Sequence, residues 1–329
     1  MNITAHAPSL LPVPAARKSP GLLIPVALEN APAKAQAAFF EFFAATIPNA
    51  NTRESYMRDV RRFFTWCQER HFDPMTVTSI HLSGYREDLR TQIEPPSVKR
   101  HFSSLRTLYA WWVEKGVLEK NPVREVKTEK FSRTEGKTPA LDLHDMQRMF
   151  ESFDTSSLIG LRDRALVAVM AYTFARVEAV VSLRVKDYAP LGKRSVIYLS
   201  EKGGKQREIP AHHKLEESLD AYIQAAAIGG EKDSPLFRSA AGRTGKLTAR
   251  PMARQDAFYM IRRRLKDAGI EGAFSCHSFR ATGITTFLEN GGSLETAQWI
   301  AGHADSRTTK LYDKRAQRAT LEDLERVRY

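Results

Sequence analysis

The segment Gly302-His303-Ala304-Asp305-Ser306-Arg307-Thr308-Thr309-Lys310-Leu311-Tyr312 is the most telling part of this chain. Gly302 indicates a helix end followed by a turn, which places His303 just beyond that helix. Tyr312 follows in a short segment expected to be helical over 306–313. A phenol has a pKa of about 10, so Tyr312 attacks a phosphodiester near neutral pH only where its proton is removed and positive charge surrounds it.

Cationic and imidazole side chains upstream supply such surroundings. His277 and Arg280 are spaced i, i+3 at the expected start of a helix, so they share one face. Arg176 follows an apolar helix, and its planar guanidinium can grip two phosphate oxygens at once. Together with Tyr312, these residues predict a phosphodiester held by cations and attacked by a phenol.

A lysine at a turn completes the set. Lys202 begins the glycine-containing turn Lys202-Gly203-Gly204-Lys205, between strands expected at 195–200 and 207–209. An ammonium on such an arm can enter a groove and protonate a departing oxygen as a general acid. Lys205 is the competitor for this role and is also a candidate for DNA contact.

Each residue also has an ordinary explanation. Arg176 can form an ion pair with Glu178, Lys202 can be a solvated turn lysine, and the two histidines can cap helices. Tyr312 can be a packing residue. A metal site at His277 lacks supporting carboxylate or cysteine spacing, so no metal and no cofactor are expected. The specificity lies in the whole constellation and its order.

The bulk composition agrees with a nucleic-acid partner. The chain has 329 residues, enough for two domains, with 42% hydrophobic and 27% charged residues. Its formal charge is +12, which favours a polyanion through phosphate neutralisation. The two cysteines, Cys67 and Cys276, form no disulfide framework or zinc pattern. With no apolar run long enough for a membrane span and no signal-peptide pattern, a cytoplasmic, bacterial-type protein is expected.

The N-terminal half is expected to be helical. Residues 1–32 are rich in Pro and Ala and predict an irregular arm, whereas 33–123 show helical periodicity. A capping box at Asn51 and Glu54 is expected to open its second helix. Four basic residues on its amphipathic helices are candidates for DNA contacts, with a solvated face as the alternative: Arg53, Lys99, Arg100 and Arg106.

The rest of the chain is expected to hold a linker and a larger domain. Residues 124–138 are polar and predict the linker. Residues 139–329 predict a mostly helical domain with a small antiparallel sheet. Helices are expected at about 142–153, 161–175, 212–228, 251–268, 277–289, 293–301 and 320–327.

At these residues the chain resembles the tyrosine recombinase (phage integrase) family, over about residues 35 to 320. The shared elements are Ala175-Arg176-Val177, the hairpin lysine, the His277-to-Arg280 box, and Gly302-His303 followed by Tyr312. The resemblance implies a mainly α fold: an N-terminal helical core-binding (SAM-like) bundle and a catalytic domain, which clamp double-stranded DNA.

The resemblance also implies roles. Tyr312 attacks the scissile phosphate to give a 3′-phosphotyrosyl bond, Arg176 and Arg280 neutralise the non-bridging oxygens, and Lys202 protonates the leaving oxygen. His277 assists proton transfer from Tyr312, and His303 donates a hydrogen bond to the phosphate.

Two departures from the family pattern stand out. An acidic residue is common three positions after the first arginine, where this chain has Ala179. Glu178 is one position earlier, and one residue turns a helical side chain by about 100°, so Glu178 is only a doubtful supporting residue. After the His-x-x-Arg box, Ala281-Thr282 replaces a common second histidine.

The expected partners are DNA recombination sites and further copies of the chain. A homotetramer on two sites is implied, with Leu321, Leu324 and Val327 docking on a neighbouring protomer. Directionality is then either simple or set by accessory directionality factors. The alternatives to a recombinase are a type IB topoisomerase-like relaxer and a DNA-binding protein whose chemistry is vestigial.

Overall fold

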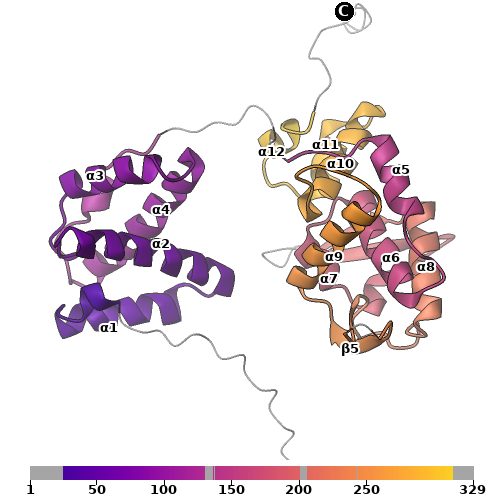
Figure 1. Ribbon diagram of the computed structural model, residues 1–329, viewed down its shortest axis with the longest axis horizontal. Helices are drawn as coiled ribbons and strands as arrows, with labels where there is room; N and C mark the ends of the chain where they lie inside the picture. Colours follow the sequence, from indigo (N-terminus) through magenta and orange to yellow (C-terminus); the bar gives the residue numbers. More distant parts are fainter. Residues whose placement is uncertain (1–24, 130–135, 137, 201–205, 243, 314–329) are drawn as a thin grey trace, which may run out of the picture. The chain divides into compact units, whose positions relative to one another are not determined.

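The computed structural model describes residues 25–129, 136, 138–200, 206–242 and 244–313. The chain divides into two compact units, Met1–Ser132 and Arg133–Tyr329. Figure 1 shows the first in indigo to purple and the second in magenta through yellow. The irregular arm expected at 1–32 falls mostly outside the described residues, and the helix expected at 320–327 falls wholly outside them.

The described part of the first unit is helical, as predicted. Its elements are η1 (Val26–Leu28), α1 (Ala33–Glu41), the π-helix η2 (Phe42–Thr46), α2 (Ala50–Glu69), α3 (Ser79–Arg90), α4 (Pro95–Glu114) and η3 (Pro122–Arg124). The expected capping box at Asn51 was wrong. Asn49 caps α2, because its side chain accepts the N–H of Thr52 at 3.1 Å and Asn51 is already inside the first turn.

Aromatic side chains hold this unit together. Phe39, Phe63, Phe64 and Trp112 are buried, and the rings of Phe64 and Trp112 stack with an interplanar angle of 2°. Large rings bury much apolar surface for few residues, which suits a small helical bundle. Val126, from the segment expected to be linker, is also in this core.

The second unit combines helices with two small antiparallel sheets. Its helices are α5 (Leu143–Glu151), α6 (Leu158–Thr173), α7 (Val177–Val181), η4 (Val185–Asp187), α8 (His213–Ala225), α9 (Arg254–Asp267), α10 (Cys276–Glu289), α11 (Leu294–Ala301) and α12 (Ser306–Lys310). Its strands are β1 (Tyr188–Leu191), β2 (Arg194–Ser200), β3 (Gln206–Pro210), β4 (Arg238–Ala240) and β5 (Leu247–Pro251).

The predicted hairpin is confirmed and extended by one strand. β2 pairs with β3 from Val196↔Pro210 to Ser200↔Gln206, and β1 adds to the other edge of β2. The strands β1, β4 and β5 were not predicted, because they are short and contain no fully buried residue, so they lack apolar alternation. The turn predicted over Lys202-Gly203-Gly204-Lys205 lies outside the described residues.

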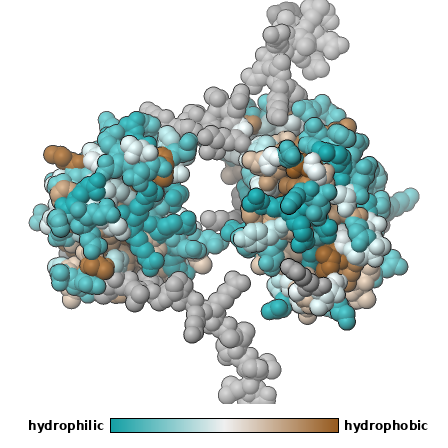
Figure 2. Space-filling model, in the orientation of Figure 1, coloured by the Kyte–Doolittle hydropathy of each residue, from teal (hydrophilic) through white to brown (hydrophobic). Residues whose placement is uncertain are grey.

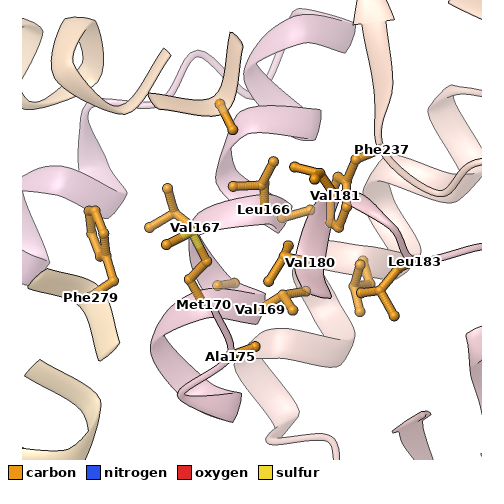
Figure 3. Close-up of a cluster of buried hydrophobic side chains, with 14 of the residues drawn as sticks. Leu166, Val167, Val169, Met170, Ala175, Val180, Val181, Leu183, Phe237 and Phe279 are labelled. Carbon is orange, nitrogen blue, oxygen red and sulfur yellow. The ribbon is translucent and has the colours of Figure 1, made fainter. Parts of the chain in front are cut away.

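Helix α6 forms the centre of the second unit. Leu166, Val167, Val169 and Met170 are all fully buried, so this part of the helix is enclosed by the core. Figure 3 shows these side chains facing Val180 and Val181 of α7 and, from elsewhere in the chain, Phe237 and Phe279. The helix that leads to Arg176 is therefore anchored in the core.

The surfaces of both units are mainly polar. Figure 2 shows their visible faces as largely hydrophilic, with separate hydrophobic patches. Among the described residues, no helix is long and apolar enough to cross a membrane. Cys67 and Cys276 are buried free thiols, and burial raises their pKa to about 12 and about 11.

Candidate active site

Tyr312 and His277 meet although they are far apart in the chain. His277 lies in the first turn of α10, which Ser275 begins with a capping box. Tyr312 follows α12, which ends at Lys310, earlier than the expected helix over 306–313. The hydroxyl of Tyr312 lies 3.1 Å from Nε2 of His277. The predicted phenol and one predicted imidazole therefore share a hydrogen bond.

The protonation states of this pair suit transfer of a proton from Tyr312 to His277. Partial removal from water, helped by the charges of Arg280 and Arg176, lowers the pKa of His277 from its ordinary value. Burial raises the pKa of Tyr312, and the same two arginines oppose that rise. At neutral pH a protonated phenol thus faces a neutral imidazole, which can accept its proton.

His303 is a second imidazole close to Tyr312. Gly302 ends α11 with a φ of 61°, a left-handed conformation that glycine adopts without strain, and this turns the chain into His303. The ring of His303 is parallel to that of Tyr312, with 8° between planes and 6.1 Å between centroids. Burial and the charges of Arg280 and Arg176 lower the pKa of His303 to about 3, so it is neutral at working pH.

Arg280 is almost fully buried, with 1% of its surface exposed. Its guanidinium donates to the carbonyl oxygen of Phe174, at the end of α6, and to that of Ala301, at the end of α11. Phe174 has a φ of 53°, which is costly for a residue with a side chain. Arg280 therefore stabilises the turn before Arg176 as well as bringing charge to the site.

Arg176 stands at the N-cap of α7, immediately after that turn, and its side chain is exposed. Its charge acts on the pKa values of His277, His303 and Tyr312, so it lies at the same site. Five of the six predicted site residues are thus brought together, and the sixth, Lys202, lies outside the described residues.

Glu178 pairs with an arginine of α9. Its carboxylate lies 4.0 Å from Nε of Arg254 on α9, and both side chains are more than half exposed. Ala179, where the family commonly has an acid, is buried in the core around α6. The described residues contain no group of three or more His, Cys, Asp or Glu arranged to hold a metal ion.

The candidate DNA-contact residues of the first unit have unequal surroundings. Lys99 is exposed on α4. Arg100 is held by the buried carboxylate of Asp59, and Arg106 donates to the carbonyl of Val126 at 3.3 Å. Arg53, on α2, donates to the carbonyl of Pro48 at 3.4 Å. Among these four, Lys99 is therefore the one whose side chain makes no hydrogen bond to the described residues of this unit.

Sequence reasoning missed residues that support the site from behind. Thr309 bonds to His303, Thr285 donates to the carbonyl of Tyr312 at 3.3 Å, and Gly283 lets α10 lie against Phe174. Arg207 of β3 donates to the carbonyls of Trp299 and Ile300 in α11. Small and buried polar residues carry no periodic signal, so the sequence alone could not single them out.

Comparison with known proteins agrees with this geometry. The model of the phage integrase family matches residues 139–318, and that of the phage integrase N-terminal SAM-like domain matches residues 38–118. The chain belongs to the phage integrase family. Within this family it is similar to the tyrosine recombinase XerD of Listeria monocytogenes, with 29% identity over an alignment of 272 positions that covers 80% of this chain and 88% of XerD.

Solved structures share the fold of this phage integrase family member. A XerH site-specific recombinase bound to a palindromic difH substrate superposes with a TM-score of 0.65 at 16% identity, covering 79% of this chain and 75% of that one. A lambda integrase tetramer bound to a Holliday junction gives 0.61 at 16% identity, covering 83% and 77%. At this identity the likeness concerns the fold.

Proposed function

We propose that this protein is a site-specific DNA recombinase that breaks and rejoins DNA through a covalent bond to Tyr312. The observation that carries the proposal is the 3.1 Å hydrogen bond between Tyr312 and neutral His277, in a site that also receives charge from Arg176 and Arg280. Membership of the phage integrase family and similarity to XerD support it.

In the first step, the oxygen of Tyr312 attacks the scissile phosphorus while the bond to the 5′ oxygen breaks. The phenolic proton passes to Nε2 of His277, which is 3.1 Å away and neutral. The products are a 3′-phosphotyrosyl bond and a 5′ hydroxyl. Lys202 is the proposed donor of the proton that the leaving 5′ oxygen takes up.

Three groups stabilise the negative charge that develops on the non-bridging oxygens. Arg176 is exposed and can bind a phosphate directly through its fork of N–H groups. His303 donates one hydrogen bond. Arg280 is buried and fixed on two carbonyls, so its main contribution is a positive charge held in place beneath the phosphate.

Rejoining is the same chemistry in reverse. A 5′ hydroxyl of a partner duplex attacks the phosphotyrosyl phosphorus and gives its proton to Lys202, and Tyr312 leaves with a proton returned by His277. One phosphoester replaces another at each step, so the energy of the bond is conserved and no nucleotide cofactor is consumed.

The first unit and the oligomer complete the proposal. The helices α2 and α4 carry the basic side chains proposed to bind DNA phosphates. A homotetramer on two DNA sites is the proposed assembly, which is supported by the lambda integrase tetramer bound to a Holliday junction. Contacts between copies are proposed to involve Leu321, Leu324 and Val327. Accessory directionality factors are a further proposed class of partner.

The test is covalent trapping in cells. The protein and its Tyr312→Phe variant are expressed, noncovalent complexes are stripped with detergent, and the DNA still attached is sequenced. The proposal predicts DNA enriched at a short inverted repeat, and only with Tyr312. Bound DNA without a covalent adduct in either protein would favour a binding protein over an enzyme.

A further inference from the structure

A buried threonine connects the two residues that flank the proposed phosphate site. Thr309 lies in α12 and has no exposed surface. Its hydroxyl is 2.9 Å from Nδ1 of His303, and its carbonyl accepts the backbone N–H of Tyr312 at 3.0 Å. One residue therefore bonds to the side chain of His303 and to the backbone of the nucleophile.

We propose that Thr309 is a positioning residue whose hydroxyl donates to Nδ1 of His303, which keeps the ring hydrogen on Nε2 and presents Nε2–H to the scissile phosphate. The inference rests on the proposed function, because it gives the donated hydrogen bond of His303 a cause. It assigns Thr309 no contact with DNA.

The direction of this hydrogen bond follows from what each nitrogen must face. A neutral imidazole carries one N–H, and its other nitrogen is an acceptor. The reverse arrangement, with Nδ1–H donating to Thr309, would turn the lone pair of Nε2 toward an anionic oxygen. Donation by the threonine hydroxyl avoids this repulsion and turns the ring into a donor.

The tautomer of His303 has to be set by a hydrogen-bond partner because the ring is neutral. Burial, together with the positive charges of Arg280 and Arg176, lowers the pKa of the ring to about 3, so the ring is neutral at pH 7. A doubly protonated ring would donate from both nitrogens whatever its neighbour did. A neutral ring donates from one, so the partner of Nδ1 decides which nitrogen carries the hydrogen.

The bond also differs from those of two other helical threonines of this protein. The hydroxyls of Thr107 and Thr173 donate to the carbonyl four residues earlier, at 2.9 and 2.6 Å. Within the residues that the structure describes, the hydroxyl of Thr309 has the imidazole of His303 as its hydrogen-bond partner instead. The fold thus directs this hydroxyl to a side chain of the site.

The test compares Thr309→Val with a matched control, Thr308→Val. Valine keeps the shape and removes the hydroxyl, and Thr308 is its exposed neighbour in the same helix. Formation of the covalent adduct is timed in a single turnover on site DNA. We expect Thr309→Val to slow the reaction by about 10- to 100-fold, less than loss of the donor itself, with DNA affinity unchanged. Thr308→Val and Thr309→Ser should react like the original protein.

A second arm separates positioning of His303 from general support of the fold. In a His303→Ala background, Thr309→Val should cause no further loss of rate, because the two residues act as one unit. An equal loss in both backgrounds, or full activity of Thr309→Val, would overturn the inference.

A third arm needs no reaction. The ¹⁵N shifts of His303 in the DNA-free full-length protein should report hydrogen on Nε2, and Thr309→Val should allow hydrogen on Nδ1. Hydrogen on Nδ1 in the original protein would overturn the inference even where DNA cleavage is normal. Absence of any covalent adduct in the original protein would instead reject the proposed function, and the NMR result would still judge Thr309.

Discussion

The hydroxyl of Tyr312 lies 3.1 Å from Nε2 of His277, although 35 residues separate them in the chain. This contact joins the segment after α12 to the first turn of α10. It places the neutral imidazole of His277, which can accept a proton, beside the hydroxyl of Tyr312 in the DNA-free protein. The chemistry proposed here depends on that pairing more than on any single charge.

The pairing predicts how cleavage depends on pH. The pKa of His277 is below its ordinary value, so the ring is already neutral and able to accept a proton at pH 7. The rate at limiting DNA, which reports groups of the free protein, should stay level from about pH 8 to about pH 6.5 and fall only as pH drops through the lowered pKa of His277. Single-turnover cleavage across pH measures this.

Substitution of His277 provides the control for that profile. His277→Gln should lower the rate by about 100-fold or more and remove its acid limb. His144→Gln, at an exposed position on α5, should change neither. An unchanged acid limb in His277→Gln would show that another group takes the proton.

Close packing at Gly283 predicts a mutation that harms the site without touching DNA. A Cβ at Gly283 of α10 would overlap the carbonyl oxygen of Ala171 and the ring of Phe174 on α6. Gly283→Ala should push the helices apart, cost about 1–3 kcal/mol of stability, and disturb the hydrogen bond from Arg280 to Phe174. Denaturant unfolding and adduct formation measure the two effects.

The matched variant is Gly230→Ala. A Cβ at Gly230 has no neighbour within 4 Å, so stability and cleavage should stay as they are. If Gly283→Ala folded and cleaved as well as Gly230→Ala, the tight contact between α10 and α6 would not matter for Arg280.

The basic residues of α4 predict two separable effects. Lys99 is exposed, so Lys99→Ala should weaken DNA binding and reduce the slope of log affinity against log salt by roughly 0.9, the share of one phosphate. Arg106 donates to the carbonyl of Val126. Arg106→Ala should therefore lower the melting temperature, because it removes about 1 kcal/mol from the free energy of unfolding.

Salt titrations of DNA binding and thermal unfolding of Lys99→Ala and Arg106→Ala measure these two effects. Arg106→Ala with normal stability and a shallower salt slope would assign the phosphate contact to Arg106 instead. Lys120, exposed outside α2 and α4, supplies the control substitution Lys120→Ala, which should leave the slope unchanged.

The sequence predicted the elements that carry apolar periodicity. The helical 33–123 region, the apolar α6 and the paired strands β2 and β3 are where the sequence placed them, because burial of a face leaves a pattern in the chain. The order of Arg176, His277, Arg280, His303 and Tyr312 likewise pointed to one site.

The sequence could not predict contacts that depend on tertiary packing. The burial of Arg280 against two carbonyls, the left-handed turn at Phe174 and the bond from Thr309 to His303 arise only when α6, α10 and α11 come together. Glu178 shows the same limit: its neighbour Arg254 is distant in the chain, and no spacing rule connects them.

The most direct test of the central claim is to identify the residue that becomes attached to DNA. The purified protein is reacted with its site, the adduct is digested with protease and nuclease, and the modified peptide is sequenced by mass spectrometry. We expect a nucleotide on the oxygen of Tyr312 through a 3′ phosphate, and no adduct from Tyr312→Phe. A nucleotide on any other residue, or an adduct that persists in Tyr312→Phe, would contradict it.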